Sequence, residues 1–273
     1  MKEFIKGVLV VCTTLIIINN LNFNKNKEVI NELCKTEKML FAHRGLSEYA
    51  ENSWQGFKQS KNLGINSFEC DVQCTKDKKL IIFHDKNAKR LLGIDKNIED
   101  LLWTDIQSKT IIHNNLITDQ YILSLDEILR LSSNFKYIYL DFKKTNKTIA
   151  DSLLVLMKKY NSYEHVLVAD ANILFLAYLK YKIPQIKTVW EGFNKGKEWS
   201  YFIVPSSLKP DYFASFFSEV DDKHIKFLNE QNLMHRKIVY DINKNNFQQA
   251  VEIGLKHLIV DYDSSLSTQI TDY

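Results

Sequence analysis

The most informative part of the sequence is Phe68-Glu69-Cys70-Asp71-Val72-Gln73, followed after a lysine-rich turn by Leu80-Ile81-Ile82-Phe83-His84-Asp85. Its alternating pattern predicts two short strands, since successive side chains of a strand point to opposite faces. Glu69 and Asp71 then share one face, where their carboxylates repel each other unless a cation lies between them. A hairpin would bring residues 71 and 84 level, with His84 beside the carboxylate pair. The same alternation also fits a half-exposed surface hairpin.

Length and composition are those of an ordinary globular protein. The chain has 273 residues, a length that suffices for one large domain or two small ones. Hydrophobic residues make up 45% of the chain and charged residues 25%, as is usual for globular proteins. The formal net charge is +3, and the basic residues are mixed with acidic ones, so no nucleic-acid-binding surface is indicated. The four cysteines form neither a disulfide framework nor a zinc-binding pattern.

The chain begins with a short apolar segment. An uncharged run over residues 7–18 follows a weakly basic start, and its length suits a signal peptide or signal anchor better than a full transmembrane helix. We expect residues 1–22 to be an uncleaved anchor, with a cleaved signal peptide or a buried helix as alternatives. Residues 23–38 would be a linker. Membrane association through residues 4–18 would place the protein at a membrane or export it to the cell envelope, with the cytoplasm as the alternative.

Residues 39–273 show the pattern of one α/β domain. Apolar strand patterns alternate with helical patterns, which indicates a mostly parallel sheet wrapped by helices. The predicted strands are Met39–His43, Phe68–Gln73, Leu80–His84, Tyr137–Phe142, His165–Ala169, Lys187–Glu191, Asp211–Ala214, Ile238–Ile242 and His257–Asp261. The predicted helices are Ser53–Leu63, Ser124–Leu131, Ile149–Tyr160, Ile173–Tyr181, Asp222–Asn232 and Phe247–Ile253. Nine strands with one hairpin fit a (β/α)8 TIM barrel, and a doubly wound open sheet is the alternative.

Two further strand ends carry residues suited to phosphate chemistry. His43 and Arg44 follow the first strand, where the imidazole could move a proton and the guanidinium could bind a phosphate. Asp141 and Lys143 share one face of the fourth strand, and Asp141 could complete an oxygen cage for Mg²⁺ or Ca²⁺. Glu51 could support His43 or the metal, or simply lie at a helix start. A capped turn and an ordinary ion pair explain these residues equally well in isolation.

Taken in order, these motifs resemble the signature of the glycerophosphodiester phosphodiesterase family. The matching residues are His43-Arg44-Gly45, Glu51-Asn52-Ser53, Gly64, Glu69-x-Asp71, Thr75-x-Asp77, His84-Asp85, Asp141-x-Lys143, Tyr240-Asp241-Ile242-Asn243 and Val260-Asp261. The resemblance covers residues 39 to 263. It implies a distorted (β/α)8 barrel, with a hairpin after the second strand, that cleaves glycerophosphodiesters to sn-glycerol 3-phosphate and an alcohol.

The resemblance also implies a role for each matched residue. His43 and His84 correspond to the acid/base pair, Arg44 and Lys143 to the phosphate-binding cations, and a small-molecule glycerophosphodiester or lysolipid would be the substrate. One divalent metal ion, Mg²⁺ or Ca²⁺, would be held by Glu69, Asp71 and Asp141. Glu51 would not bind the ion directly but would support the residues that do. Departures include Asp141 where glutamate is common, Lys78 in place of a turn glycine, and Asp241 in place of threonine.

Two rival functions remain open. A lysophospholipase D-like or lipid-cyclising enzyme of the same superfamily would suit a membrane anchor, although residues 86–121 leave little room for a large lipid-binding insertion. A non-catalytic phosphate-binding barrel is the other rival. The presence of both His43 and His84 argues against it, because binding requires no proton transfer.

Overall fold

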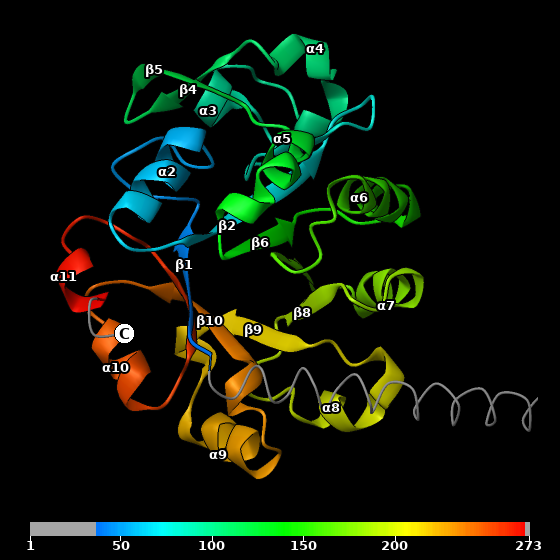
Figure 1. The fold of residues 1–273 in the computed structure, drawn as a ribbon, viewed down its shortest axis with the longest axis vertical. Coiled ribbons are helices and arrows are strands. Elements are labelled where there is room, and N and C mark those ends of the chain that lie inside the picture. Colours follow the sequence, from blue (N-terminus) through cyan, green and yellow to red (C-terminus); the bar gives the residue numbers. More distant parts are fainter. Residues whose placement is uncertain (1–36, 271–273) are drawn as a thin grey trace, which may run out of the picture.

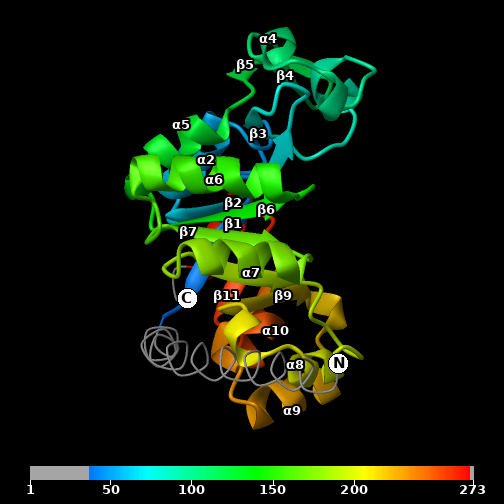
Figure 2. The ribbon, with the colours of Figure 1, turned by 90° about the vertical axis from the view of Figure 1, so that its right-hand side faces the viewer.

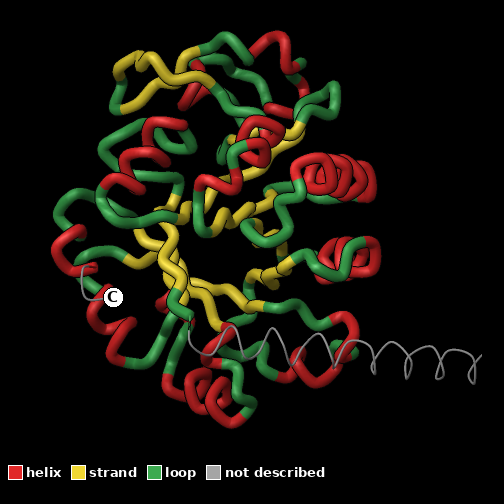
Figure 3. The backbone as a smooth tube through the Cα atoms, in the orientation of Figure 1, coloured by secondary structure: helices red, strands yellow, loops and turns green. Residues whose placement is uncertain are grey.

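Eight parallel strands close into a barrel with helices around it (Figures 1 and 3). The computed structural model describes residues 37–270, so the predicted anchor (1–22) and most of the predicted linker (23–38) lie outside the described residues. The barrel strands are β1 (Met39–His43), β2 (Ser67–Cys74), β6 (Tyr137–Phe142), β7 (Val166–Asp170), β8 (Lys187–Glu191), β9 (Tyr212–Phe216), β10 (Lys237–Ile242) and β11 (His257–Val260). Pairing of β1 with both β11 and β2 closes the ring. The predicted TIM barrel is therefore confirmed, and the open-sheet alternative is wrong.

The hairpin after the second strand is present, but its register differs by one residue from the prediction. Strand β3 (Leu80–Ile82) runs antiparallel to β2 with Val72 opposite Ile82, and the amide of Phe83 donates to the carbonyl of Asp71 over 2.9 Å. Residue 71 is thus level with 83 rather than 84. Because β3 ends at Ile82, His84 lies beyond the strand, where the alternation of a strand no longer sets the direction of its side chain.

A structured insertion follows the hairpin and lies beyond one side of the barrel (Figure 2). It contains helices α3 (Lys89–Leu92) and α4 (Trp103–Ile106) and a two-stranded sheet of β4 (Thr110–His113) and β5 (Leu116–Tyr121). A separate apolar cluster holds it together, and this cluster includes Ile81, Phe83, Leu91, Ile98, Ile106, Ile111 and Ile122. None of these four elements was predicted.

The helices between the barrel strands begin and end within two residues of their predicted bounds. The six predicted helices are α2 (Trp54–Asn62), α5 (Leu125–Arg130), α6 (Lys147–Tyr160), α7 (Ile173–Lys182), α9 (Asp222–Glu230) and α10 (Phe247–Glu252). Their starts follow from capping: Ser53 accepts from the amide of Gly56, and Ser124 forms a reciprocal capping box with Glu127. Two further short helices are α8 (Trp199–Ile203) and α11 (Ser267–Ile270). Within residues 37–270, no helix has the length and hydropathy needed to cross a bilayer.

The two faces of β2 divide the molecule as the alternation predicted. Phe68, Cys70 and Val72 pack in the large apolar layer between the strands and the surrounding helices. Glu69 and Asp71 point the other way and are 3% and 0% exposed. Burial of two carboxylates is unfavourable without compensating charges, so this face of β2 marks the site.

Candidate active site

One pocket at the carboxyl ends of the barrel strands is lined by six of the eight predicted site residues, all except Asp71 and Glu51. Its volume is about 290 Å³. Its lining comes from several strand ends and consists of His43, Arg44, Glu69, His84, Tyr139, Asp141, Lys143, Glu191, Phe216, Tyr240, Asp241, Ile259 and Asp261. Asp71 lies buried below it, in contact with Arg44 and Lys143. The barrel thus joins the hairpin residues to those of β1 and β6.

Three carboxylates crowd together at the base of this pocket. One oxygen each of Glu69, Asp71 and Asp141 lies within 4.8 Å of the other two. Burial, reinforced by the charges of Asp71 and Asp141, holds the pKa of Glu69 well above its ordinary value. Burial likewise raises the pKa of Asp141. Hard oxygen donors held this close suit a divalent cation, which would relieve their repulsion, so these residues could hold a metal.

Two cations compensate Asp71, the most buried of the three carboxylates. The ammonium of Lys143 lies 2.7 Å from one oxygen of Asp71 and also contacts Asp141. The Nε of Arg44 lies 3.1 Å from the other oxygen of Asp71. Although burial alone would raise the pKa of Asp71, the charges of Lys143 and Arg44 hold it below the ordinary value. Asp71 therefore stays ionised next to carboxyls that are harder to ionise.

A strained turn after β1 places Arg44. The φ angle of Arg44 is +54°, in the left-handed region that few side chains adopt, and its amide donates to the carbonyl of Glu69 over 3.1 Å. The next residue, Gly45, also has a positive φ, and a Cβ there would lie 2.7 Å from the carbonyl carbon of Gly56. Glycine is needed at this point because helix α2 packs directly against the turn.

Each of the two histidines has a carboxylate partner. The Nδ1 of His43 lies 2.6 Å from Asp261, and its Nε2 lies 3.8 Å from Glu69. The Nδ1 of His84 lies 2.8 Å from Asp85. A carboxylate on Nδ1 favours the tautomer with its proton there, which leaves Nε2 free to accept a proton.

Glu51, which the sequence placed either in support of His43 or the metal or at a helix start, lies three residues before α2 and contacts two arginines. Its carboxylate accepts hydrogen bonds from Arg90 at 2.6 and 2.8 Å, and it lies 3.4 Å from Nη1 of Arg44. Glu51, His84 and Asp85 form a second group of potential metal ligands. Because Arg90 donates to both carboxylates of this group, its guanidinium already supplies a compensating charge there.

Several residues of the site were not assigned roles from the sequence. Asn52 is buried and donates from Nδ2 to Asp71 over 2.7 Å. Tyr139 donates to Glu191 over 2.6 Å, and burial raises the pKa of Glu191 to about 8. Asn52 and Asp261 belong to motifs noted in the sequence, so their positions were a usable signal. Arg90 had no such signal, because its partners are brought to it only by the tertiary fold.

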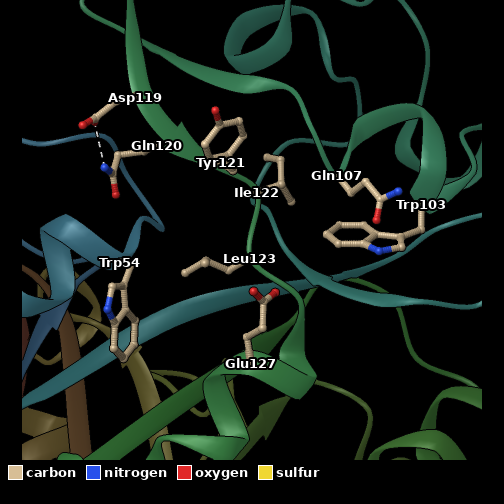
Figure 4. Close-up of a pocket in the computed structure, with 9 residues that line it drawn as sticks. All are labelled: Trp54, Trp103, Gln107, Asp119, Gln120, Tyr121, Ile122, Leu123 and Glu127. Carbon is tan, nitrogen blue, oxygen red and sulfur yellow. Dashed lines mark hydrogen bonds between the residues drawn. The ribbon is translucent and has the colours of Figure 1, made fainter.

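A second pocket, of about 450 Å³, lies between the insertion and helices α2 and α5 (Figure 4). It is lined by Trp54, Trp103, Gln107, Asp119, Gln120, Tyr121, Ile122, Leu123 and Glu127. Its lining holds no histidine, and Glu127 is engaged in capping α5. His43 and His84 both line the pocket at the barrel mouth instead.

The fold and the site define a TIM-barrel protein whose strands carry, at their carboxyl ends, a cluster of three carboxylates and two histidines that are each paired with a carboxylate. The model of the glycerophosphoryl diester phosphodiesterase family matches residues 43–262. The chain belongs to this family, whose members are phosphoric diester hydrolases.

Individual relatives agree with this assignment. A glycerophosphodiester phosphodiesterase of Caldanaerobacter subterraneus is 27% identical over 156 residues, or 55% of this chain and 64% of the relative. Human lysophospholipase D is 30% identical over 141 residues, or 48% of this chain and 44% of the relative. These matches span less than two thirds of the relatives' length. The structure of an Oleispira antarctica phosphodiesterase in complex with sn-glycerol 3-phosphate has a TM-score of 0.76 at 18% identity, covering 86% of this chain and 98% of the other, and shows the same fold.

Proposed function

We propose that this protein hydrolyses glycerophosphodiesters to sn-glycerol 3-phosphate and an alcohol, with the help of Mg²⁺ or Ca²⁺. The observation that carries the proposal is the meeting of two carboxylate-paired histidines with a cluster of three carboxylates in one pocket. The family assignment and the product named for the Oleispira enzyme support it.

The residues of the pocket divide the work of phosphodiester cleavage. A divalent ion on Glu69, Asp71 and Asp141 would neutralise charge on the non-bridging oxygens. Lys143 and Arg44 would bind the same phosphate as fixed cations. One histidine would take the proton of the attacking water or glycerol hydroxyl, and the other would protonate the departing alkoxide. His43 and His84 are assigned to these two transfers without a distinction between them.

A lysophospholipase D-like activity is the second candidate. The match to human lysophospholipase D favours it. Leu116 and Ile117, at the start of β5 in the insertion, are 71% and 77% exposed and offer an apolar surface to a lipid chain. A lipid-cyclising reaction would use the same two proton transfers, with a hydroxyl of the substrate in place of the attacking water. A non-catalytic phosphate-binding barrel finds less support, because it would leave both proton-transfer groups without a use.

The test is release of glycerol 3-phosphate by the purified full chain. Glycerophosphocholine and lysophosphatidylcholine are offered in parallel, each with Mg²⁺, with Ca²⁺ and with a chelator. We expect metal-dependent glycerol 3-phosphate from glycerophosphocholine. Choline released only from the lysolipid would favour the second candidate, and no turnover of either substrate with metal present would refute both.

A further inference from the structure

Arg90 connects the insertion to the barrel mouth. It lies on α3, and its guanidinium forms two forks. Nε and Nη2 donate to the two oxygens of Asp85 over 2.7 and 2.9 Å. Nη1 and Nη2 donate to the two oxygens of Glu51 over 2.6 and 2.8 Å. Bidentate pairs of this kind restrict orientation as well as distance, because the guanidinium is planar.

Through Asp85 this arginine reaches a proton-transfer group. The same carboxylate oxygen that accepts from Nη2 of Arg90 lies 2.8 Å from Nδ1 of His84. The guanidinium of Arg90 therefore holds the carboxylate of Asp85 in one orientation beside Nδ1 of His84.

The backbone that carries Arg90 is itself held in place. Leu91 and Leu92, next to it on α3, are buried in the apolar cluster of the insertion. The amide of Ala88 donates to the carbonyl of Lys96 over 2.9 Å, which closes the loop around α3. A side chain on such a support can hold a partner still, whereas one on a mobile loop cannot.

Two alternative roles for Arg90 fit its contacts less well. A cation that binds the substrate phosphate would line the pocket and have free donors. Arg90 is absent from the pocket lining, and its four donations already serve two carboxylates. A simple surface ion pair involves one carboxylate in one geometry and is worth little. Arg90 is 49% exposed, but both of its partners are more than three quarters covered and both contact site residues.

We propose that Arg90 is a positioning residue that holds Asp85 so that Asp85 orients His84. The inference rests on the proposed phosphodiesterase function for its kinetic readout. It assigns to the insertion a part in building the active site, beyond covering one side of the barrel.

The first experiment compares Arg90→Gln, Arg90→Lys and the control Lys89→Gln in the full chain. Lys89 is the neighbouring cation on α3, and it pairs with Asp95 outside the pocket. We expect Arg90→Gln to lower kcat on the order of 10- to 100-fold with KM changed by less than about threefold, since misorientation affects the chemical step. Arg90→Lys should keep the charge but recover only part of the rate. A kcat of Arg90→Gln within about twofold of wild type would overturn the proposal.

The second experiment asks whether Arg90 acts through Asp85. If it does, the double variant Arg90→Gln/Asp85→Asn should be no slower than the slower single variant. Losses that multiply in the double variant would show two independent roles and refute the proposal. Added guanidinium should restore part of the rate of Arg90→Ala, whereas ammonium should not, because only the planar fork reproduces both contacts.

A third measurement does not depend on turnover. The ring ¹⁵N shifts of His84, assigned by their loss in His84→Ala, report which nitrogen carries the proton at alkaline pH. We expect the Nδ1–H tautomer to dominate in wild type and Lys89→Gln and to become mixed in Arg90→Gln. An unchanged tautomer in Arg90→Gln would overturn the inference even if no substrate were turned over, whereas absent turnover with the expected tautomer change would count only against the proposed function.

Discussion

The Nδ1 atom of His43 lies 2.6 Å from a carboxylate oxygen of Asp261, although the two residues are 218 positions apart in the sequence. The closure of the barrel explains the contact. Strands β1 and β11 are neighbours with Ala42 opposite Val260, so the next residue on each comes to the same place at the mouth. The contact directs Nε2 of His43 toward Glu69, 3.8 Å away.

We therefore predict that Asp261→Asn lowers kcat on the order of 10- to 100-fold with little change in KM. An asparagine can donate to Nδ1 and so favours the wrong tautomer of His43. The loss should stay moderate because Asp261 is 47% exposed and water can partly replace it. Asp263→Asn is the control, since Asp263 bonds to Ser265 and Leu266 outside the pocket. Equal rates for the two variants would contradict this role.

Removal of either histidine should abolish most of the turnover. His43→Ala and His84→Ala are each expected to lower kcat at least about 10²-fold, the usual contribution of a general acid or base. Both side chains are about one third exposed, so the fold should survive. His113→Ala, on β4 of the insertion, is the control. Near-normal rates in His43→Ala or His84→Ala, measured as glycerol 3-phosphate release, would show that the site is misassigned.

The carboxylate side of the site could be predicted from local pattern because strand alternation is a local property. Glu69, Asp71 and Asp141 lie on the faces that the alternation of β2 and β6 predicted. Lys143 follows the last residue of β6 and still contacts Asp71 and Asp141 on that face. The position of His84 opposite β2 could not be predicted as well, because the turn between β2 and β3 decides the register of the hairpin. The observed register differs by one residue from the predicted one, and β3 ends at Ile82, before His84.

The insertion shows a different kind of limit. The segment Ile112-His113-Asn114-Asn115-Leu116-Ile117 carries a two-asparagine turn between apolar residues, and both asparagines adopt positive φ, so β4 and β5 had a readable turn signal. The partners of Arg90 had none. Glu51 and Asp85 are 39 and 5 residues away from it, and only the packing of α3 brings it to both.

Metal affinity should depend on Asp141. The variant Asp141→Asn loses one of three negative charges around the proposed ion, so the metal concentration that gives half-maximal activity should rise on the order of 10- to 100-fold. Calorimetric titration with Mg²⁺ and with Ca²⁺ measures the same loss without substrate. Asp126→Asn is the matched control, because Asp126 pairs with Lys159 away from the pocket. An unchanged metal requirement would remove Asp141 from the ligand set.

Asn52 should stabilise the fold through Asp71. Its Nδ2 donates to the Asp71 carboxylate over 2.7 Å, and its φ is +56°. We predict that Asn52→Gly, which removes the side chain without straining the backbone, costs about 2 kcal/mol in urea unfolding, as expected for a buried hydrogen bond to a charged group. Asn115→Gly is the control, because Asn115 has φ +62° but is exposed. Equal unfolding midpoints for both variants would contradict the prediction.

Acid should destabilise the protein partly through His257. This side chain is 0% exposed, Nε2 donates to the carbonyl of His235 over 2.8 Å, and the buried Nδ1 has no hydrogen-bond partner among the described residues. Burial therefore lowers its pKa to about 4 from an ordinary value of 6.5. Because the folded-state pKa is the lower one, the unfolded chain takes up the proton first as the pH falls. The stabilising contribution of neutral His257 is complete above about pH 6.5 and is lost toward pH 4.

His257→Gln keeps a donor for the His235 carbonyl but cannot take up a proton. Between about pH 7 and about pH 4.5, wild type should lose about 2 to 3 kcal/mol more unfolding free energy than this variant, since each pKa unit is worth about 1.4 kcal/mol. His113→Gln, which changes a histidine of the insertion, should follow the wild-type pH dependence. Urea unfolding at both pH values decides the matter, and parallel losses in wild type and His257→Gln would show that other groups cause the acid sensitivity.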